Sequence, residues 1–299
     1  MLNNLIKFSK AFNSEEACSK YLIQKRFGDK LHCIKCESAK VYPLKDGKRL
    51  KCISCDKVFS VRIGTIFESS RIPLTKWFLA IYLTISHKKG LSSIQLAKEI
   101  DVTQKSAWFM QHRIRKAFKS TSDALLEGIV EVDETYIGGK EKNKHASKRV
   151  KGTQGRSTKT KALVLGMLQR GGELRFFHIK DASGKAIRSY VNGNILEGTR
   201  IMSDEHGVYK TLGSKFVHEA VNHSMGIYGI GDVTTNGIES AFAVLKKIIG
   251  GVYHHVSRKH LHRYLDDVSY RQNTKKVQEK FDAFLEKIDV RLKWTELIA

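Results

Sequence analysis

Four side chains are of the types, and at the positions, needed to hold metal ions for chemistry on phosphate esters. Asp133 lies within an alternating, strand-like segment, and Asp204 ends a short apolar segment. Asn236 and Glu239 open a helical pattern. A carboxylate among apolar and β-branched neighbours is costly unless it binds a cation or is well hydrogen-bonded. Two ions about 4 Å apart, held by such groups, activate a water or a hydroxyl for attack and stabilise the leaving oxygen. We therefore expect a site for two Mg2+ (or Mn2+) ions.

The third ligand of this site has two candidates on one helical face. The apolar residues that would bury one side of the predicted helix are Ile238, Phe242, Leu245 and Ile249. The other side carries, at the spacing i, i+3, i+7 and i+10, the residues Asn236, Glu239, Ala243 and Lys246. Glu239 offers the carboxylate that Mg2+ prefers, whereas Asn236 is neutral and could complete the shell or hold a phosphate. We favour Glu239 and keep Asn236 as the alternative.

The elements that must position these groups follow the order of an RNase H-like domain. Periodicity predicts three antiparallel strands, a short amphipathic helix and two more strands before the carboxylate-bearing helix. Their ranges are 128–136, 161–168, 173–179, 185–196, 200–204 and 215–221. In this arrangement Asp133 and Asp204 lie on adjacent strands. We expect the basic, glycine-containing run from Gly138 to about Lys161 to be a mobile loop that orders on phosphates. A disordered, solubilising insertion is the alternative.

Four of the five cysteines form two CxxC motifs with fifteen residues between them. These cysteines are Cys33, Cys36, Cys52 and Cys55. Two such knuckles close a tetrahedral shell of thiolates around Zn2+, and a closed shell leaves no open position for catalysis. A turn at Asp46-Gly47 predicts a hairpin between the two motifs. We therefore expect a zinc ribbon with a structural Zn2+, and Cys18 as an ordinary buried residue.

The segment 91–108 has the layout of a helix-turn-helix. Ser92 or Ser93 is expected to cap the first helix, and Thr103 the second. The apolar residues of the first helix are Ile94, Leu96, Ala97 and Ile100. Near its start, where a recognition helix meets base edges, the second helix presents Gln104, Lys105 and Ser106. Farther along this helix, the residues expected to reach phosphates are Gln111, His112, Arg113, Arg115 and Lys116.

The charge balance points to a polyanionic partner. The chain has 53 Lys and Arg against 30 Asp and Glu, a formal net charge of +23, and such an excess is typical of proteins that bind nucleic acid. A ribosome-associated or merely soluble basic protein is the alternative. We find neither an apolar run of about 18 residues nor a secretory signal, so we expect no membrane partner. Cysteines clustered in a metal motif indicate a reducing compartment, and we expect a cytoplasmic, nucleoid-associated protein.

Together these stretches resemble the insertion-sequence transposases of the DDE superfamily, in particular the bacterial ISXO-like branch with its N-terminal zinc ribbon. The matching stretches are the four-cysteine set, Glu131–Gly139, Ser203-Asp204 and the block from Thr235 to Asn273. The resemblance implies that Asp133 and Asp204 are metal ligands and that Lys246 contacts DNA near the site. Glu239 has 34 residues between it and Asp204 and precedes Lys246 by seven, which fits the DDE signature.

The resemblance implies a transposase that nicks the ends of its element and transfers them into target DNA, by a cut-and-paste or a replicative route. We expect a homo-oligomer, a dimer in the synaptic complex, that binds transposon ends and target. The expected fold is α+β and multidomain. Its parts are a zinc ribbon (1–66), a helix-turn-helix segment (67–122), an RNase H-like catalytic domain (123–275) and a C-terminal helical tail (276–299). Two alternatives are a domesticated, catalytically inactive DNA-binding regulator and a structure-specific nuclease or resolvase.

Overall fold

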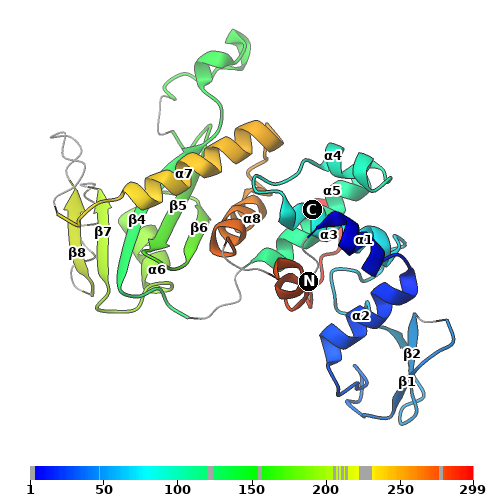
Figure 1. Ribbon diagram of the computed structural model, residues 1–299. Coiled ribbons are helices and arrows are strands. Elements are labelled where there is room, and N and C mark those ends of the chain that lie inside the picture. Colours follow the sequence, from blue (N-terminus) through cyan, green and yellow to red (C-terminus); the bar gives the residue numbers. More distant parts are fainter. Residues whose placement is uncertain are drawn as a thin grey trace. The chain divides into compact units, whose positions relative to one another are not determined.

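The computed structural model divides the chain into two compact units (Figure 1). One unit combines residues 1–119 with 276–299, and the other comprises residues 120–275. The described residues are 4–46, 48–119, 124–153, 157–204, 207, 209, 212, 215–221, 231–275 and 279–298. The predicted boundary at 122/123 falls within residues 120–123, and the one at 275/276 adjoins residues 276–278. Both stretches lie outside the described residues. The first unit thus groups the predicted zinc ribbon, helix-turn-helix and tail, whose exact boundaries stay predictions.

The first unit is mostly helical, with one small antiparallel sheet of order β1-β2-β3. Its helices are α1 (Leu5–Ala11), α2 (Glu15–Phe27), α3 (Leu74–Ser86), α4 (Ser93–Glu99), α5 (Gln104–Phe118), α9 (Lys280–Leu285) and α10 (Trp294–Ile298). Its strands are β1 (Val41–Pro43), β2 (Arg49–Cys52) and β3 (Val58–Ser60). The predicted hairpin is therefore present as β1 and β2, although Gly47 of its turn lies outside the described residues. Sequence analysis missed β3, which is only three residues long.

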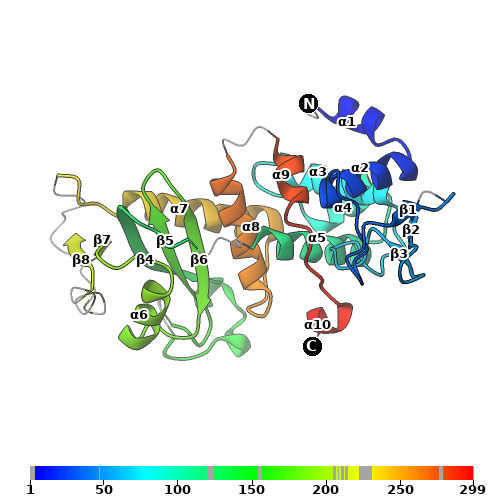
Figure 2. The same cartoon turned by 90° about the horizontal axis from the view of Figure 1, so that it is seen from below.

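The C-terminal segment completes the core of this unit. Phe281 of α9 packs with its ring centroid 4.9 Å from that of Phe8 and 5.3 Å from that of Phe78. Trp294 of α10 lies against Phe109 of α5, with ring centroids 5.2 Å apart. Figure 2 shows α9 beside α3 and α10 near the C-terminus. The tail is thus an integral layer of the first unit because it covers aromatic side chains of α1, α3 and α5.

The helix-turn-helix is confirmed in its caps and corrected in two details. The hydroxyl of Ser92 accepts the Gln95 N–H, and that of Thr103 accepts the Ser106 N–H, so both predicted caps form. Of the apolar residues assigned to the first helix, Leu96, Ala97 and Ile100 are buried, whereas Ile94 is 62% exposed. It lies in the first turn of a seven-residue helix.

The second correction concerns the residues expected to reach phosphates from α5. Gln111, His112, Arg113 and Arg115 are all buried. Arg113 is 6% exposed, and its guanidinium donates to the carbonyl oxygens of Ile66, Glu68 and Leu292. These carbonyls belong to non-helical segments of the same unit, so the expected phosphate contact is replaced by an internal one. Polar side chains at the far end of α5 therefore hold the unit together.

The second unit is a five-stranded mixed sheet with helices on both faces. Its strands are β4 (Ile129–Ile137), β5 (Ala162–Gln169), β6 (Leu174–Ile179), β7 (Arg200–Asp204) and β8 (Val217–Val221). Their spatial order is β6-β5-β4-β7-β8. β4, β5 and β6 are antiparallel, whereas β7 runs parallel to β4 and β8 parallel to β7. This order and these directions are those of an RNase H-like sheet, as expected from the sequence.

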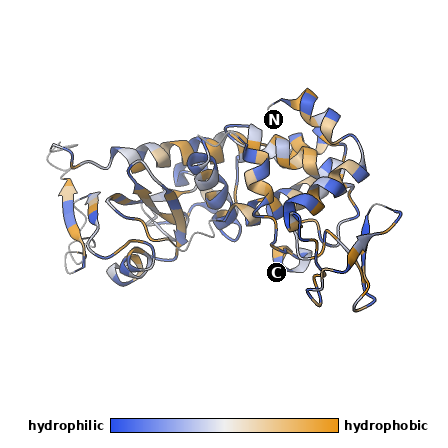
Figure 3. Cartoon of the chain, turned by 60° about the horizontal axis from the view of Figure 1, so that its bottom comes forward, coloured by the Kyte–Doolittle hydropathy of each residue, from blue (hydrophilic) through white to orange (hydrophobic). Residues whose placement is uncertain are grey.

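Helices cover the two faces of this sheet unequally. One face is covered by α6 (Gly184–Asn192). The other face is covered by α7 (Asn236–Ile248) and α8 (Leu261–Asn273). A π-helical turn (Ile249–Tyr253) extends α7. Figure 3 shows the strands and helices in mixtures of orange and blue, as expected for elements with one buried and one exposed face. The run predicted to be a loop contains two 3-10 turns, Glu141–Asn143 and Ala146–Lys148. In the part of the chain that the structure describes, no helix is long and apolar enough to cross a bilayer.

Candidate active site

β4 presents Asp133 on the face of the sheet that α7 covers. Residues two apart on a strand share a face, and Ile137 packs with α7 in one hydrophobic cluster. Asp133 is paired in register with Gly166 of β5. A Cβ at Gly166 would lie 2.7 Å from Ile238 Cδ1 and 2.8 Å from Phe242 Cζ. The missing side chain therefore lets α7 approach the sheet directly beside the aspartate.

The carboxylates around Asp133 are close enough to interact. Burial raises the pKa of Asp133 to about 7, and the negative charges of Glu134, Asp204 and Glu239 add to the rise. The Glu134 N–H, which donates to Asp133 Oδ1 at 2.7 Å, acts in the opposite direction. The fold thus gathers negative charges from two parallel strands and one helix at a partly buried aspartate. A divalent cation would relieve this repulsion, so the donor set fits the expected metal.

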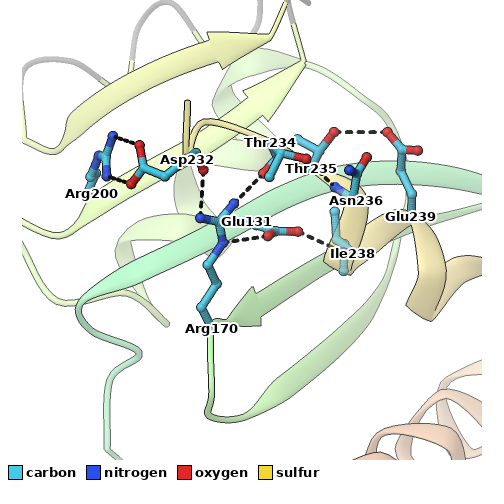
Figure 4. Close-up of polar contacts among 9 residues, drawn as sticks. All are labelled: Glu131, Arg170, Arg200, Asp232, Thr234, Thr235, Asn236, Ile238 and Glu239. Carbon is cyan, nitrogen blue, oxygen red and sulfur yellow. Dashed lines mark hydrogen bonds and ion pairs between the residues drawn. The ribbon is translucent and has the colours of Figure 1, made fainter. Parts of the chain in front are cut away.

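The two candidates for the third ligand both lie at the exposed start of α7 (Figure 4). Glu239 Oε1 accepts a hydrogen bond from the Thr235 hydroxyl at 2.9 Å. Asn236 uses its backbone N–H to donate to Thr234 Oγ1 at 3.1 Å. Only Glu239 carries a charge that acts on Asp133, which favours it as the ligand. The choice between the two stays a prediction.

Glu134 faces away from α7 and makes a separate contact. The hydroxyl of Tyr209, a fully buried residue in the core under α6, donates to Glu134 Oε2. Burial, together with the charges of Glu134, Asp133 and Asp204, raises the pKa of Tyr209. Sequence analysis assigned no role to this pair, because nothing in the local pattern links residues 75 positions apart.

A second polar group missed by the sequence analysis fastens α7 to β4 (Figure 4). Glu131, whose side chain is 3% exposed, binds Arg170 Nε through Oε1 at 2.7 Å. Its Oε2 accepts the backbone N–H of Ile238 at 2.8 Å. Arg170 also donates to the carbonyl oxygens of Asp232 and Thr234, each at 2.8 Å. We call these contacts the Glu131–Arg170 clamp. Its one sequence signal is that Glu131 precedes Asp133 by two and therefore shares its face.

Lys246 lines a cavity of about 790 Å3 at the far end of α7. The helix brings it to the same exposed face as Glu239, and seven residues correspond to about 10 Å along the axis. The other basic or titratable lining residues are Lys144, His254, His255 and Arg258. Apolar lining comes from Tyr136, Ile137, Ala162, Ile249, Val256 and Leu261. The cavity therefore combines positive charge with an apolar floor, and it begins a few residues beyond Asp133 on β4.

The four cysteines of the ribbon fit a tetrahedral metal site. Their sulfur atoms all lie within 4.8 Å of one another. The Cys33 and Cys55 sulfurs are 3.7 Å apart, and those of Cys36 and Cys52 are 3.6 Å apart. A tetrahedron with Zn–S bonds of about 2.3 Å has sulfurs about 3.8 Å apart. Zn2+ at these residues is structural, since four thiolates leave no open position. Cys18 is buried and lies outside this cluster, as expected.

The carboxylates are spread more widely than the thiolates. Among the described residues, the cysteines form the one group of three or more His, Cys, Asp or Glu side chains compact enough to surround a single ion. Asp133, Asp204 and Glu239 therefore interact through space without converging on one point. His254, His255, His260 and His262 form no such group either.

Comparison with known proteins gives matches over both units. Residues 125–273 match the ISXO2-like transposase domain family, and residues 13–58 match the transposase zinc-ribbon domain family. An uncharacterised protein in transposable element ISH50 of Halobacterium salinarum is 31% identical over 268 residues. That alignment covers 86% of this chain and 90% of the relative.

Solved structures similar to this chain include two of Mos1. The Mos1 strand transfer complex covers 72% of this chain and 78% of its own, at 12% identity and a TM-score of 0.28. A pre-cleavage Mos1 transpososome covers 72% and 79%, at 10% identity and a TM-score of 0.27. Both superpositions are loose, so the family assignment rests on the sequence matches.

Proposed function

The chain belongs to the family of ISXO2-like transposases, and on that premise we propose that it binds the ends of an insertion sequence, cleaves them and transfers them into target DNA. The observation that carries this proposal is the group of carboxylates around Asp133, drawn from β4, β7 and α7. An aspartate surrounded by like charges is suited to holding divalent cations and poorly suited to a purely structural role.

Each residue of the site has a distinct role in this proposal. Asp133, Asp204 and Glu239 hold Mg2+ or Mn2+, which when bound activates the attacking oxygen and stabilises the leaving one. The Thr235 hydroxyl orients the Glu239 carboxylate through its hydrogen bond. Lys246 binds a phosphate of the DNA strand two helical turns farther along α7. The structural Zn2+ holds the ribbon in shape and takes no part in the reaction.

The DNA strand leaves the carboxylates toward the cavity beside Lys246. Both β4 and α7 lead from the carboxylates to this cavity, over about 10 Å in each case. Lys246 and Arg258 supply positive charge there for the phosphates of the strand. In the first unit, Gln104 and Lys105 are exposed at the start of α5, which supports α5 as the helix that reads the ends of the element.

A strand-transfer assay with Mg2+ and DNA carrying the repeats that flank the gene tests the proposal. Asp133→Ala and Asp204→Ala are each expected to lower the rate by a factor on the order of 10^3 or more, because each removes a ligand of the same site. Binding of the repeat DNA should be retained in both. A wild-type protein as inert as the variants, yet bound to the repeats, would instead fit the DNA-binding regulator.

Separate variants of the helix decide the third ligand. Glu239→Gln removes the charge while keeping the shape and the acceptor for Thr235, and is expected to abolish metal-dependent cleavage. Asn236→Ala is expected to retain cleavage at a reduced rate, because a neutral amide contributes less to cation binding. The measurement is the cleavage rate against Mg2+ concentration. The assignment is reversed when Asn236→Ala, and not Glu239→Gln, is the inactive variant.

A further inference from the structure

The N-cap residue of α7 does not cap the helix with its own side chain, although the Thr234 hydroxyl accepts the N–H of Asn236 at 3.1 Å. Thr235 occupies the N-cap position, but its hydroxyl makes no capping hydrogen bond and donates to Glu239 instead. A helix leaves its first backbone N–H groups without partners inside the helix, and they need acceptors from elsewhere. Glu131 of β4 supplies one acceptor by binding the N–H of Ile238 at 2.8 Å. The helix that carries Glu239 is therefore capped by the strand that carries Asp133.

Arg170 holds this cap in place by hydrogen-bonding both to Glu131 and to the segment that precedes α7. Its guanidinium donates to Glu131 and to the carbonyl oxygens of Asp232 and Thr234, at 2.7, 2.8 and 2.8 Å. The planar fork of arginine presents these donors in fixed directions, which a lysine cannot do. The side chain of Asp232 is in turn paired with Arg200 of β7, with Nη2 and Oδ1 3.0 Å apart. The segment that precedes α7 is thus bonded to Arg170, directly after β5, and through it to β4, and also to Arg200 of β7.

We propose that Glu131 and Arg170 are positioning residues that set Glu239 and Asn236 against Asp133. This inference rests on the proposed role of the carboxylates as metal ligands. Asp133 lies two residues beyond Glu131 on β4, and Glu239 directly follows Ile238 on α7, so the clamp joins the two elements next to the ligands. A loss of the clamp would let the first turn of α7 shift or fray while the rest of the helix stays packed on the sheet.

Gly237 gives this arrangement a steric requirement. A Cβ there would lie 2.7 Å from Glu131 Oε2 and 2.9 Å from Leu168 Cδ2. Alanine has a higher helix propensity than glycine, so on propensity alone Gly237→Ala would strengthen α7. The proposal requires the opposite, because the added methyl displaces the carboxylate that caps the helix. Gly237→Ala therefore disturbs the clamp without removing a charged group.

The first unit contains the same type of cap, formed by different residues, and it supplies a matched control. Glu15 Oε2 accepts the N–H of Leu74, the first residue of α3, at 2.7 Å. Its other oxygen pairs with Arg62, which also donates to the carbonyl oxygens of Ser70 and Ile72 at 3.2 and 3.0 Å. Glu15→Gln thus breaks an equivalent cap in a unit that carries none of the proposed ligands.

The test measures Mn2+ binding to the full-length protein, by electron paramagnetic resonance, with Asp133→Asn marking the carboxylate site. Glu131→Gln places an amide donor against an existing donor, and we expect it to weaken Mn2+ binding by about 10- to 100-fold. Gly237→Ala should weaken binding in the same direction. Glu15→Gln should lower the thermal midpoint and leave Mn2+ binding as in wild type. Unchanged Mn2+ binding in both Glu131→Gln and Gly237→Ala overturns the positioning role.

Amide hydrogen exchange without metal provides the second readout. Glu131→Gln should remove protection at Ile238 and Glu239 and leave the second half of α7 protected, whereas Glu15→Gln should leave α7 unchanged. Full protection of Ile238 in Glu131→Gln overturns the clamp itself. When Asp133→Asn binds Mn2+ like wild type, the carboxylates are not the metal site and the proposed function fails. A loss of protection confined to the first turn of α7 still supports the clamp in that case.

Discussion

At the scale of single residues, the site is built on an aspartate whose environment opposes its charge. Burial and the charges of Glu134, Asp204 and Glu239 raise the pKa of Asp133 to about 7. Such an arrangement weakens the metal-free protein in exchange for a strong attraction to cations. Stability and activity should therefore respond to a substitution at Asp133 in opposite directions.

We expect metal-free Asp133→Asn to be more stable than wild type, by an amount that depends on pH. The folded pKa is about 7 against a usual value of 3.8, so wild type loses stability as pH rises between these values. The advantage of the variant should be absent at pH 4, grow to pH 7 and then level off at on the order of 2–4 kcal/mol. Asn keeps the oxygen that accepts the Glu134 N–H.

Chemical denaturation at several pH values without divalent ions measures this difference. Added Mg2+ should stabilise wild type and leave Asp133→Asn unchanged, because a ligand stabilises the state that binds it. A difference between the two proteins that does not vary from pH 4 to pH 8 would contradict the raised pKa of Asp133.

At the scale of elements, the central feature is the close packing of α7 on the sheet. Gly166 on β5 makes room for Ile238 and Phe242, and the clamp holds the first turn of α7 in place. The same type of clamp, Glu15 with Arg62, caps α3 in the other unit. The chain thus twice uses a carboxylate and an arginine, distant in sequence, to start a helix whose own N-cap side chain makes no capping bond.

Gly166→Ala is expected to lower the stability of the second unit by about 1–3 kcal/mol, the usual cost of overpacking a core. The new methyl meets the buried side chains of Ile238 and Phe242 and pushes α7 away from Asp133. Thermal unfolding gives the stability, and the cleavage rate gives the effect on the site. Gly251→Ala is the control, since its Cβ would point into open space. Equal stability of the two variants would contradict the packing described here.

At the scale of the whole molecule, the zinc-ribbon cysteines and the proposed metal-binding carboxylates belong to different units. The zinc cysteines lie within residues 1–119, and the carboxylates lie within residues 120–275. The chain passes from the first unit to the second and returns, because residues 279–298 complete the aromatic core around Phe8 and Phe78. We therefore expect loss of the ribbon to weaken the proposed DNA binding and to leave the second unit folded.

Removal of zinc is expected to unfold the ribbon and to weaken binding of the repeat DNA. Structural zinc contributes directly to folding, since four thiolates cannot pack together without the ion. Cys36→Ser should reproduce the effect of a chelator, whereas Cys18→Ala should keep zinc bound. Circular dichroism of the second unit and Mn2+ binding at the carboxylates should not change. DNA binding that survives full zinc removal would exclude the ribbon as a DNA-reading part.

The sequence by itself determined those features that depend on local spacing. Two CxxC motifs around a hairpin predict the zinc site, because the geometry of each knuckle is local. The 3.6-residue period placed Asn236, Glu239 and Lys246 on the exposed face of α7, since burial on a helix follows its own axis. The caps at Ser92 and Thr103 were predictable as well, because each hydroxyl binds the backbone N–H three residues farther along. The succession of strands along the chain followed from the alternation of apolar residues, whereas the pairing of β7 with β4 is a feature of the tertiary structure.

Only the tertiary structure decided which distant groups meet. Glu131 and Asp133 are both acidic residues on one face of β4, yet Glu131 caps α7 and only Asp133 lies among the other carboxylates. Arg113 and Arg115 have the charge of phosphate-binding residues but are buried, because loops remote in sequence place carbonyl oxygens around Arg113. The period of a helix shows which residues share a face, but it does not show which segment packs against that face. The identity of that segment depends on packing between segments a hundred residues apart.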